Sequence, residues 1–237
     1  MRRVAAALCT LLAFFSPQAP VALDQEQHHH LKLENKYVRV FDVSVLPGDE
    51  TLYHIHANDY LFVSIGDAAL KAQMLDGQPF EMNVKDGEVR YTKGPITHRV
   101  INPSGNVFRN ITVEVLPTPT ANDYTKPPAA VDAHPRSVPL RQPLNYVPGE
   151  PLVLENDRVR VVRIVLEQGQ SIGVHPHSLP ELAVAVTDGR ILIESPGEKP
   201  VTANFKAGDF RWYDAPRTHS LKNIGRTRFE AIAIELK

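Results

Sequence analysis

The stretch GQSIGVHPHSLPE, residues 169–181, combines a turn glycine, two histidines separated by one residue, and a glutamate. Because side chains alternate across a strand, His175 and His177 point to the same face, and Glu181 shares their parity. If the strand resumes after the bend that the two prolines imply, two imidazoles and a carboxylate converge. Such a mixed nitrogen and oxygen set is typical of a site for a divalent transition metal.

A related stretch, GDETLYHIHANDY, lies 121 positions earlier, at residues 48–60. The same offset places Leu33–Asn35 on Leu154–Asn156 and Val38–Val40 on Val159–Val161. Roughly two dozen identical pairs occur over about 84 aligned positions, too many for coincidence at one fixed register. The sequence therefore predicts a duplicated domain.

Within each copy, apolar residues recur with a period of two, and Gly, Pro, Asp and Ser punctuate the runs. This pattern is typical of short β-strands, and no apolar helical stripe of three turns interrupts it. We expect two all-β domains, over residues 23–116 and 151–237, each a barrel or a sandwich. Residues 117–150 contain eight prolines and are predicted to be a linker.

Six of the ten histidines form two triplets in the 121-residue register. The triplets are His54, His56, His98 and His175, His177, His219. In an apolar barrel without a cation, such clusters would leave unpaired ring nitrogens, each costing about 1 to 3 kcal/mol. A bound divalent ion removes this cost. Ligand type alone does not choose among Mn, Fe, Co, Ni, Cu and Zn.

The sequence resembles the cupin superfamily, specifically a bicupin with two such domains in tandem. The first cupin motif, glycine, five residues, His-x-His and then a glutamate, matches residues 169–181 in full. The second motif matches Gly208, Pro216, His219 and Asn223. The first copy carries the equivalent positions Gly48, His54, His56, Gly87, Pro95, His98 and Asn102. The resemblance implies two double-stranded β-helix (jelly-roll) barrels, each with a metal held in its mouth.

The first copy departs from the motif because Tyr60 takes the glutamate position. The neighbouring Asp59 has the wrong parity to replace it. The first site would then be either a working three-histidine site or a decayed copy kept for packing. We expect the second site to bind metal more tightly, since Glu181 adds direct charge attraction.

By family analogy, the leading hypothesis is a metal-dependent dioxygenase or related oxidoreductase acting on a small organic molecule that chelates the ion. Glu181 would be a fourth ligand or a catalytic base. A decarboxylase or isomerase would use the same ion as a Lewis acid, and a non-catalytic protein would only bind or sense a ligand. Arg90 and Arg211 repeat in register beside aromatic residues. Arg211 is therefore a candidate for binding an anionic substrate. The alternative is that both arginines form ordinary surface ion pairs, with acids such as Glu88 and Asp209.

Residues 1–22 have the layout of a secretory signal peptide, with two arginines, a twelve-residue apolar run, and alanines at 19 and 22 for cleavage. We therefore expect a periplasmic or secreted protein that has no membrane contact once processed. The only cysteine, Cys9, lies inside this segment. A net charge of -1 without basic stripes argues against nucleic acid as a partner. The run His28–His30 and His134 are interpreted as solvated residues, and the oligomeric state is left open.

Overall fold

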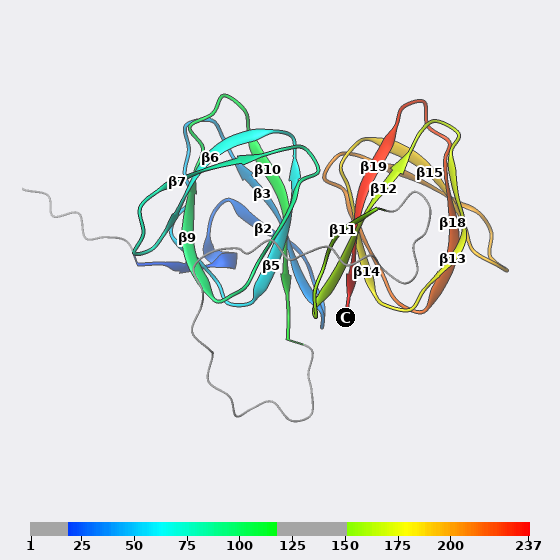
Figure 1. The fold of residues 1–237 in the computed structure, drawn as a ribbon, viewed down its shortest axis with the longest axis horizontal. Coiled ribbons are helices and arrows are strands. Elements are labelled where there is room, and N and C mark those ends of the chain that lie inside the picture. Colours follow the sequence, from blue (N-terminus) through cyan, green and yellow to red (C-terminus); the bar gives the residue numbers. More distant parts are fainter. Residues whose placement is uncertain (1–18, 118–150) are drawn as a thin grey trace, which may run out of the picture.

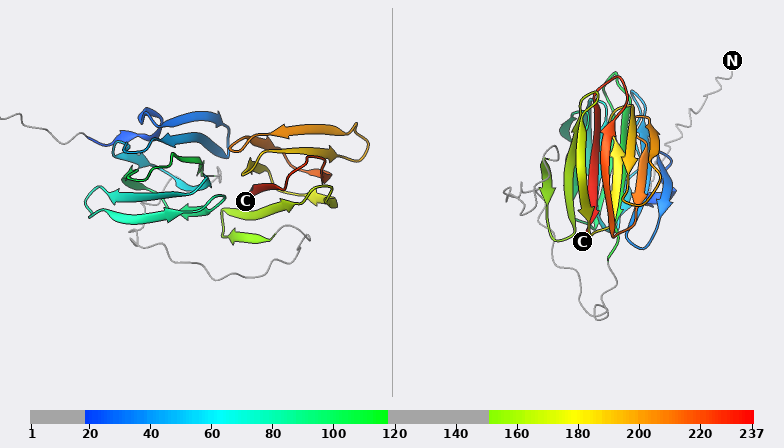
Figure 2. Two further views of the ribbon diagram at one scale, coloured as in Figure 1. Left: turned by 90° about the horizontal axis from the view of Figure 1, so that it is seen from above. Right: turned by 90° about the vertical axis from the view of Figure 1, so that its right-hand side faces the viewer.

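Two β-barrels lie side by side in the computed structural model, which describes residues 19–117 and 151–237 (Figures 1 and 2). The prediction of an all-β chain with two jelly-roll barrels is confirmed. Most of the predicted signal peptide, residues 1–18, lies outside the described residues. So do residues 118–150, nearly all of the predicted linker, together with His134. No helix of the described residues is long and apolar enough to cross a membrane.

Each barrel is made of two sheets that face one another. In the first barrel one sheet has the order β1-β4-β9-β6-β7 and the other β2-β3-β10-β5-β8. Their elements are β1 (Val21–Ala22), η1 (Leu23–Gln25), β2 (His29–Glu34), β3 (Val38–Val45), β4 (His54–His56), β5 (Asp59–Ile65), β6 (Ala68–Met74), β7 (Phe80–Val84), β8 (Val89–Thr92), β9 (Ile96–Ile101) and β10 (Phe108–Val115).

The second barrel repeats this plan. Its sheets have the orders β11-β12-β19-β14-β17 and β13-β18-β15-β16. Their strands are β11 (Leu152–Glu155), β12 (Val159–Leu166), β13 (Ser171–His177), β14 (Glu181–Ala185), β15 (Gly189–Glu194), β16 (Val201–Phe205), β17 (Phe210–Tyr213), β18 (Arg217–Asn223) and β19 (Phe229–Leu236).

The central strands of each barrel are buried on both faces, because one face lines the barrel and the other contacts the second barrel. In β3, Val38 and Val40 join a core shared by the two barrels, whereas Phe41 and Val43 join the interior of the first barrel. Residues 40 and 41 are adjacent in a continuous strand, so their side chains point to opposite faces of the sheet. This arrangement explains why apolar residues at both parities occur in one strand.

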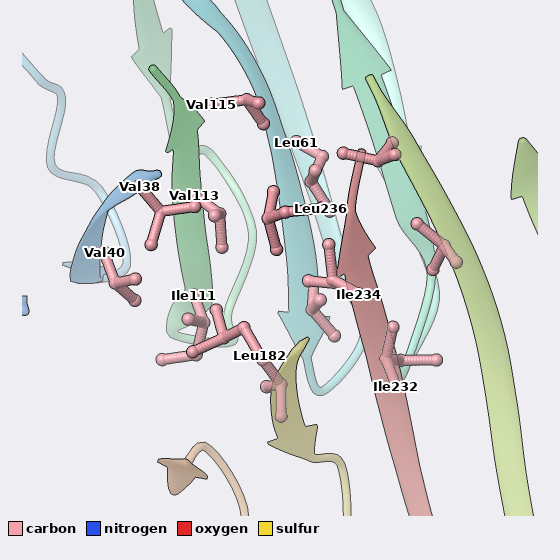
Figure 3. Close-up of a cluster of buried hydrophobic side chains, with 14 of the residues drawn as sticks. Val38, Val40, Leu61, Ile111, Val113, Val115, Leu182, Ile232, Ile234 and Leu236 are labelled. Carbon is pink, nitrogen blue, oxygen red and sulfur yellow. The ribbon is translucent and has the colours of Figure 1, made fainter. Parts of the chain in front are cut away.

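The shared core is formed by β3, β5 and β10 of the first barrel and β12, β14 and β19 of the second. Figure 3 shows Ile111 and Val113 from one side near Leu182 and Ile234 from the other. Each fully buried Val, Leu or Ile contributes about 1.5 to 3 kcal/mol relative to exposure. Within the described residues, the two barrels are therefore held together by a hydrophobic core.

Polar contacts at the edge of this core are reciprocal. Arg109 of the first barrel donates to the backbone carbonyl of Ala207, at 2.9 Å, and Arg163 of the second donates to that of Gly87, at 2.6 Å. Each arginine also pairs with a carboxylate of its own barrel. These bonds fix the relative orientation of the two barrels.

The segment before β2 belongs to the first barrel. Val21 and Ala22 pair with His54 and Ile55 in parallel, and Leu23 is buried in the barrel interior. The two residues of β1 lie inside the predicted signal peptide, so cleavage after Ala19 would keep this strand and cleavage after Ala22 would remove it.

The interpretation of His28–His30 as a solvated tail is wrong. His28 and His29 are buried, and only His30 is exposed. The cause is Glu26, which is 1% exposed and accepts hydrogen bonds from both buried histidines. A buried carboxylate requires such partners, and it therefore draws the two rings inward.

Candidate metal centres

Three histidine side chains converge in the second barrel. The Nε2 atom of His219 lies 3.1 Å from Nε2 of His177 and 3.2 Å from Nε2 of His175. His175 and His219 are paired neighbours on β13 and β18, so the strand register places their rings side by side. All three residues are buried.

These distances fit a common metal ion. Two nitrogens bound at about 2.1 Å to one ion, at bond angles of about 90 to 109°, lie about 3.0 to 3.4 Å apart. The His175 ring is oriented for this role, because its Nδ1 donates to the Gly173 carbonyl at 2.8 Å and leaves the Nε2 lone pair toward the centre. Without an ion, these contacts are satisfied only as hydrogen bonds, and a single proton on Nε2 of His219 can serve only one of them at a time.

Glu181 lies at the edge of this centre, where it contacts the outer nitrogen of a ligand ring. Its Oε2 is 3.0 Å from Nδ1 of His177, without hydrogen-bond geometry, and its Oε1 accepts from Nη2 of Arg217 at 2.7 Å. A second buried carboxylate, Glu235, lies 3.3 Å from the same Nδ1 and pairs with Arg160. Together they orient His177 in the way that outer carboxylates orient metal-ligating histidines.

Arg217 contacts both the acid and a ligand. Besides Glu181, its Nη1 lies 3.2 Å from Nδ1 of His219, and its guanidinium stacks 3.9 Å above the Tyr213 ring. Since a guanidinium only donates, Nδ1 of His219 accepts, and the proton of that ring then lies on Nε2, in the centre. We expected the negative charge of Glu181 to tighten metal binding at this site, and the positive charge of Arg217 offsets that effect.

The neighbouring charged groups give the three histidine rings different pKa values. Burial opposes protonation of His177, but Glu181 and Glu235 outweigh it and raise its pKa to about 9. Burial, reinforced by Arg217, lowers the pKa of His219 to about 3. Burial also lowers the pKa of His175. At neutral pH the rings of His175 and His219 are therefore uncharged, and His177 must release its proton when a metal binds.

Replacing Arg217 with isoleucine, the residue at the equivalent position of the first barrel, is expected to tighten metal binding at the second site about tenfold. The change removes a positive charge beside the ion and frees Nδ1 of His219 and the carboxylate of Glu181. Calorimetric titration with Co²⁺ measures the affinity. Arg211→Ile is the matched control, and a gain of equal size in that control would mean that only net charge changed.

A small apolar cavity of about 40 Å³ adjoins the centre inside the second barrel. Its wall includes His177, Glu181, Arg217 and His219 together with aliphatic and aromatic side chains. Arg211, the predicted substrate-binding arginine, lies instead over the Phe205 ring, 4.6 Å from its centroid, and is not among the lining residues. Arg90 pairs with Glu88, as an ordinary strand arginine would.

The first barrel places His54, His56 and His98 together, as the repeat predicts. The His98 ring centroid lies 4.6 Å from that of His54 and 5.2 Å from that of His56. His54 repeats the orientation of His175, since its Nδ1 donates to the Leu52 carbonyl at 2.9 Å. The Nε2 atom of His98 is buried and has no hydrogen-bond partner among the described residues.

Tyr60 fills the space that Glu181 occupies in the other copy. Its ring stacks on His56 with centroids 3.7 Å apart and an interplanar angle of 14°. Burial raises the pKa of Tyr60 to about 12, so the phenol stays neutral. Glu114, the counterpart of Glu235, lies 4.0 Å from Nδ1 of His56. The first site therefore has a neutral group at the glutamate position, with the carboxylate of Glu114 behind His56.

A fourth histidine, His29, enters this site from β2. Its candidate ligand atom and those of His54 and His56 all lie within 4.8 Å of one another. Sequence reasoning missed His29, and it also missed Arg217 and the pair Glu114 and Glu235. The pair carried a usable signal, because a glutamate repeats in register near the end of the last strand of each copy. No comparable signal marked the other two.

Comparison with known proteins relates the chain to solved structures of low sequence identity. AerE from Microcystis aeruginosa matches with a TM-score of 0.61 and 12% identity, over 88% of this chain and 97% of that one. A Bacillus subtilis oxalate decarboxylase mutant matches with a TM-score of 0.57 and 16% identity, over 87% and 74%. A cupin 2 conserved barrel domain protein from Leptotrichia buccalis gives 0.54 and 10%, over 88% of both chains. No family model and no curated protein sequence matches the chain.

Proposed function

Because the chain has the two-barrel fold of the cupin superfamily, we propose that it is a metal-dependent enzyme whose active site lies in the second barrel and acts on a small organic acid. One observation carries this proposal. The Nε2 atoms of His177 and His175 lie 3.1 and 3.2 Å from Nε2 of His219, beside an apolar cavity lined also by an arginine and a carboxylate. A bound divalent ion would supply a Lewis-acidic centre with positions open to substrate.

The residues around the centre have complementary roles in this proposal. Arg217 would bind the carboxylate of the substrate, because its planar fork matches that group and it lines the cavity. When the substrate takes over Arg217, Glu181 would lose its main partner and become free to accept or donate a proton. The small cavity favours a substrate of few atoms.

The leading reaction is an oxidation of the dioxygenase type, in which both atoms of one O₂ are incorporated into the substrate. Glu181 would take a proton from the substrate and return it to the product. A second candidate is decarboxylation, in which one CO₂ is released and Glu181 returns a proton to carbon. The adjacency of Glu181 and Arg217 favours this alternative, and two-barrel oxalate decarboxylases share the fold. Manganese centres are described for the Bacillus subtilis oxalate decarboxylase, so Mn²⁺ is the first ion to test.

Chelation is expected to abolish turnover, and a single divalent ion is expected to restore it. The protein, loaded in turn with Mn²⁺, Fe²⁺, Co²⁺, Ni²⁺, Cu²⁺ or Zn²⁺, is mixed with small hydroxy, keto and dicarboxylic acids while O₂ uptake and CO₂ release are recorded. Stoichiometric O₂ uptake supports the dioxygenase reaction, and CO₂ release without O₂ uptake supports decarboxylation. Ligand binding that persists after chelation, with no turnover when any of the six ions is added, would contradict both and indicate a binding protein.

Export to the periplasm or the cell exterior belongs to the same proposal. It is supported by the charge and hydropathy pattern of residues 1–22. Amino-terminal sequencing of the protein recovered outside the cytoplasm would locate the cleavage point. A new terminus after Ala19 would keep β1, whose residues pair with β4.

A further inference from the structure

We propose that His29 is a metal ligand of the first barrel and that Glu26 positions it, so that the N-terminal segment completes a four-histidine centre in place of the missing glutamate. The proposal concerns a different site from the proposed enzymatic one and does not depend on turnover there. It rests on the packing of His29, on the hydrogen bonds of Glu26 and on the residues that surround the cluster.

The position of His29 is that of a ligand. Its ring centroid lies 4.5 Å from that of His54 and 6.2 Å from that of His56, and it is 8% exposed. Residues of β2 are held there by pairing with β3, in which His29 is opposite Val43. In the sheet order β2-β3-β10-β5-β8, the strand of His29 (β2) and the strand of Tyr60 (β5) lie on opposite sides of β3 and β10. The two side chains therefore reach the histidine cluster from opposite sides.

Glu26 fixes the tautomer of this ring. Its Oε2 accepts a hydrogen bond from Nδ1 of His29 at 2.6 Å, which leaves Nε2 of His29 as a lone-pair donor. The carboxylate also accepts from the backbone N–H of His28 and of Leu52, so it is held rigidly. A carboxylate behind a histidine in this way is the usual outer partner of a metal ligand, since it orients the ring and raises its basicity.

The charge around the cluster suits a cation. None of the hydrogen bonds or ion pairs of Glu26 within the described residues involves a lysine or arginine, and its side chain is fully buried. The position of Arg217 in the second barrel is taken here by Ile96, which pairs with His56 across the strands. No guanidinium stands at that position, and Glu26 and Asp49 share the single ring of His28. The negative charge behind His29 therefore makes the first centre more favourable for a dication.

The unpartnered Nε2 of His98 points to the same conclusion. A buried ring nitrogen with no hydrogen bond costs about 1 to 3 kcal/mol, and this atom has none within residues 19–117 and 151–237. An ion held by His29, His54 and His56 with His98 beside them would satisfy it. The donor set would then be four imidazole nitrogens, which suits Co, Ni, Cu or Zn better than Mg or Ca.

The test uses the full chain with the second centre disabled by His175→Ala and His219→Ala, and Co²⁺ as the probe. One equivalent of Co²⁺ is expected to bind, and His29→Ala is expected to weaken it at least tenfold. His30→Ala is the matched control, because His30 is the exposed neighbour on the same strand. Glu26→Gln is expected to weaken binding less than His29→Ala, with the exposed Asp24→Asn as its control.

A second measurement needs no substitution at His29. X-ray absorption of the Co²⁺-loaded protein counts imidazole ligands, and four are expected, falling to three in His29→Ala. Three imidazoles in the chain that retains His29 would overturn the proposal, even if His29→Ala failed to fold. Equal Co²⁺ affinity of folded His29→Ala and His30→Ala would overturn it as well.

Discussion

His219→Ala is expected to remove one of two metal equivalents and to abolish turnover. The side chain provides the nitrogen that lies between the other two, at 3.1 and 3.2 Å. Loss of an outer partner alone typically weakens metal binding 10- to 100-fold, so loss of a direct ligand should weaken it by at least about 100-fold. Elemental analysis after dialysis gives the stoichiometry, and the O₂ and CO₂ assays give the activity.

The control for this experiment is the equivalent change in the other barrel, His98→Ala. It is expected to leave turnover in place, because the two centres lie in separate barrels. If His219→Ala keeps both equivalents and full turnover, the second barrel is not the catalytic one. If His98→Ala abolishes turnover while His219→Ala does not, the assignment of the two sites must be reversed.

Ile234→Asp is expected to separate the two barrels or to prevent folding of the second. Ile234 is fully buried in the shared core, and an uncompensated charge there should cost more than about 4 kcal/mol. A protease site introduced between residues 118 and 150 makes the effect visible. After cleavage, the two halves of the otherwise unchanged protein should stay together in sedimentation, and those of Ile234→Asp should not.

A milder pair of substitutions separates barrel contact from barrel stability. Ile234→Ala and Ile191→Ala should each lower the free energy of unfolding by about 2 to 5 kcal/mol. Ile191 is buried inside the second barrel, away from the shared core. Only Ile234→Ala should weaken the association of the cleaved halves. Dissociation of the unchanged halves after cleavage would contradict a hydrophobic contact between the barrels.

Much of the fold could be predicted from local patterns. Alternating apolar residues and turn glycines identify strands, and the fixed 121-residue register identifies two equivalent domains. The contact between the barrels could not be predicted. A strand buried on both faces has the same apolar sequence pattern whether its second face packs on a helix, a sheet or another domain. Val38 and Phe41 illustrate this: they are close in sequence but belong to different cores.

The histidines of the repeated motif could be named in advance because side-chain parity and the repeat both select them. Arg217 could not, since its role depends on lying opposite His177 in the register of β13 and β18. His29 could not either. It follows a predicted signal segment, where chains are usually loose, and its inward position depends on Glu26, a residue that no sequence pattern distinguishes.

The surfaces through which the barrels meet are built from equivalent positions of the two repeats, such as Leu61 with Leu182 and Ile111 with Ile232. A surface of this kind is self-complementary, so a single-barrel ancestor would have formed a symmetric homodimer through it. In such a homodimer both subunits have the same sequence, so a substitution in one pocket is always present in the other. Two copies within one chain are free of that constraint, and the two pockets differ, with Arg217 in one and Tyr60 in the other.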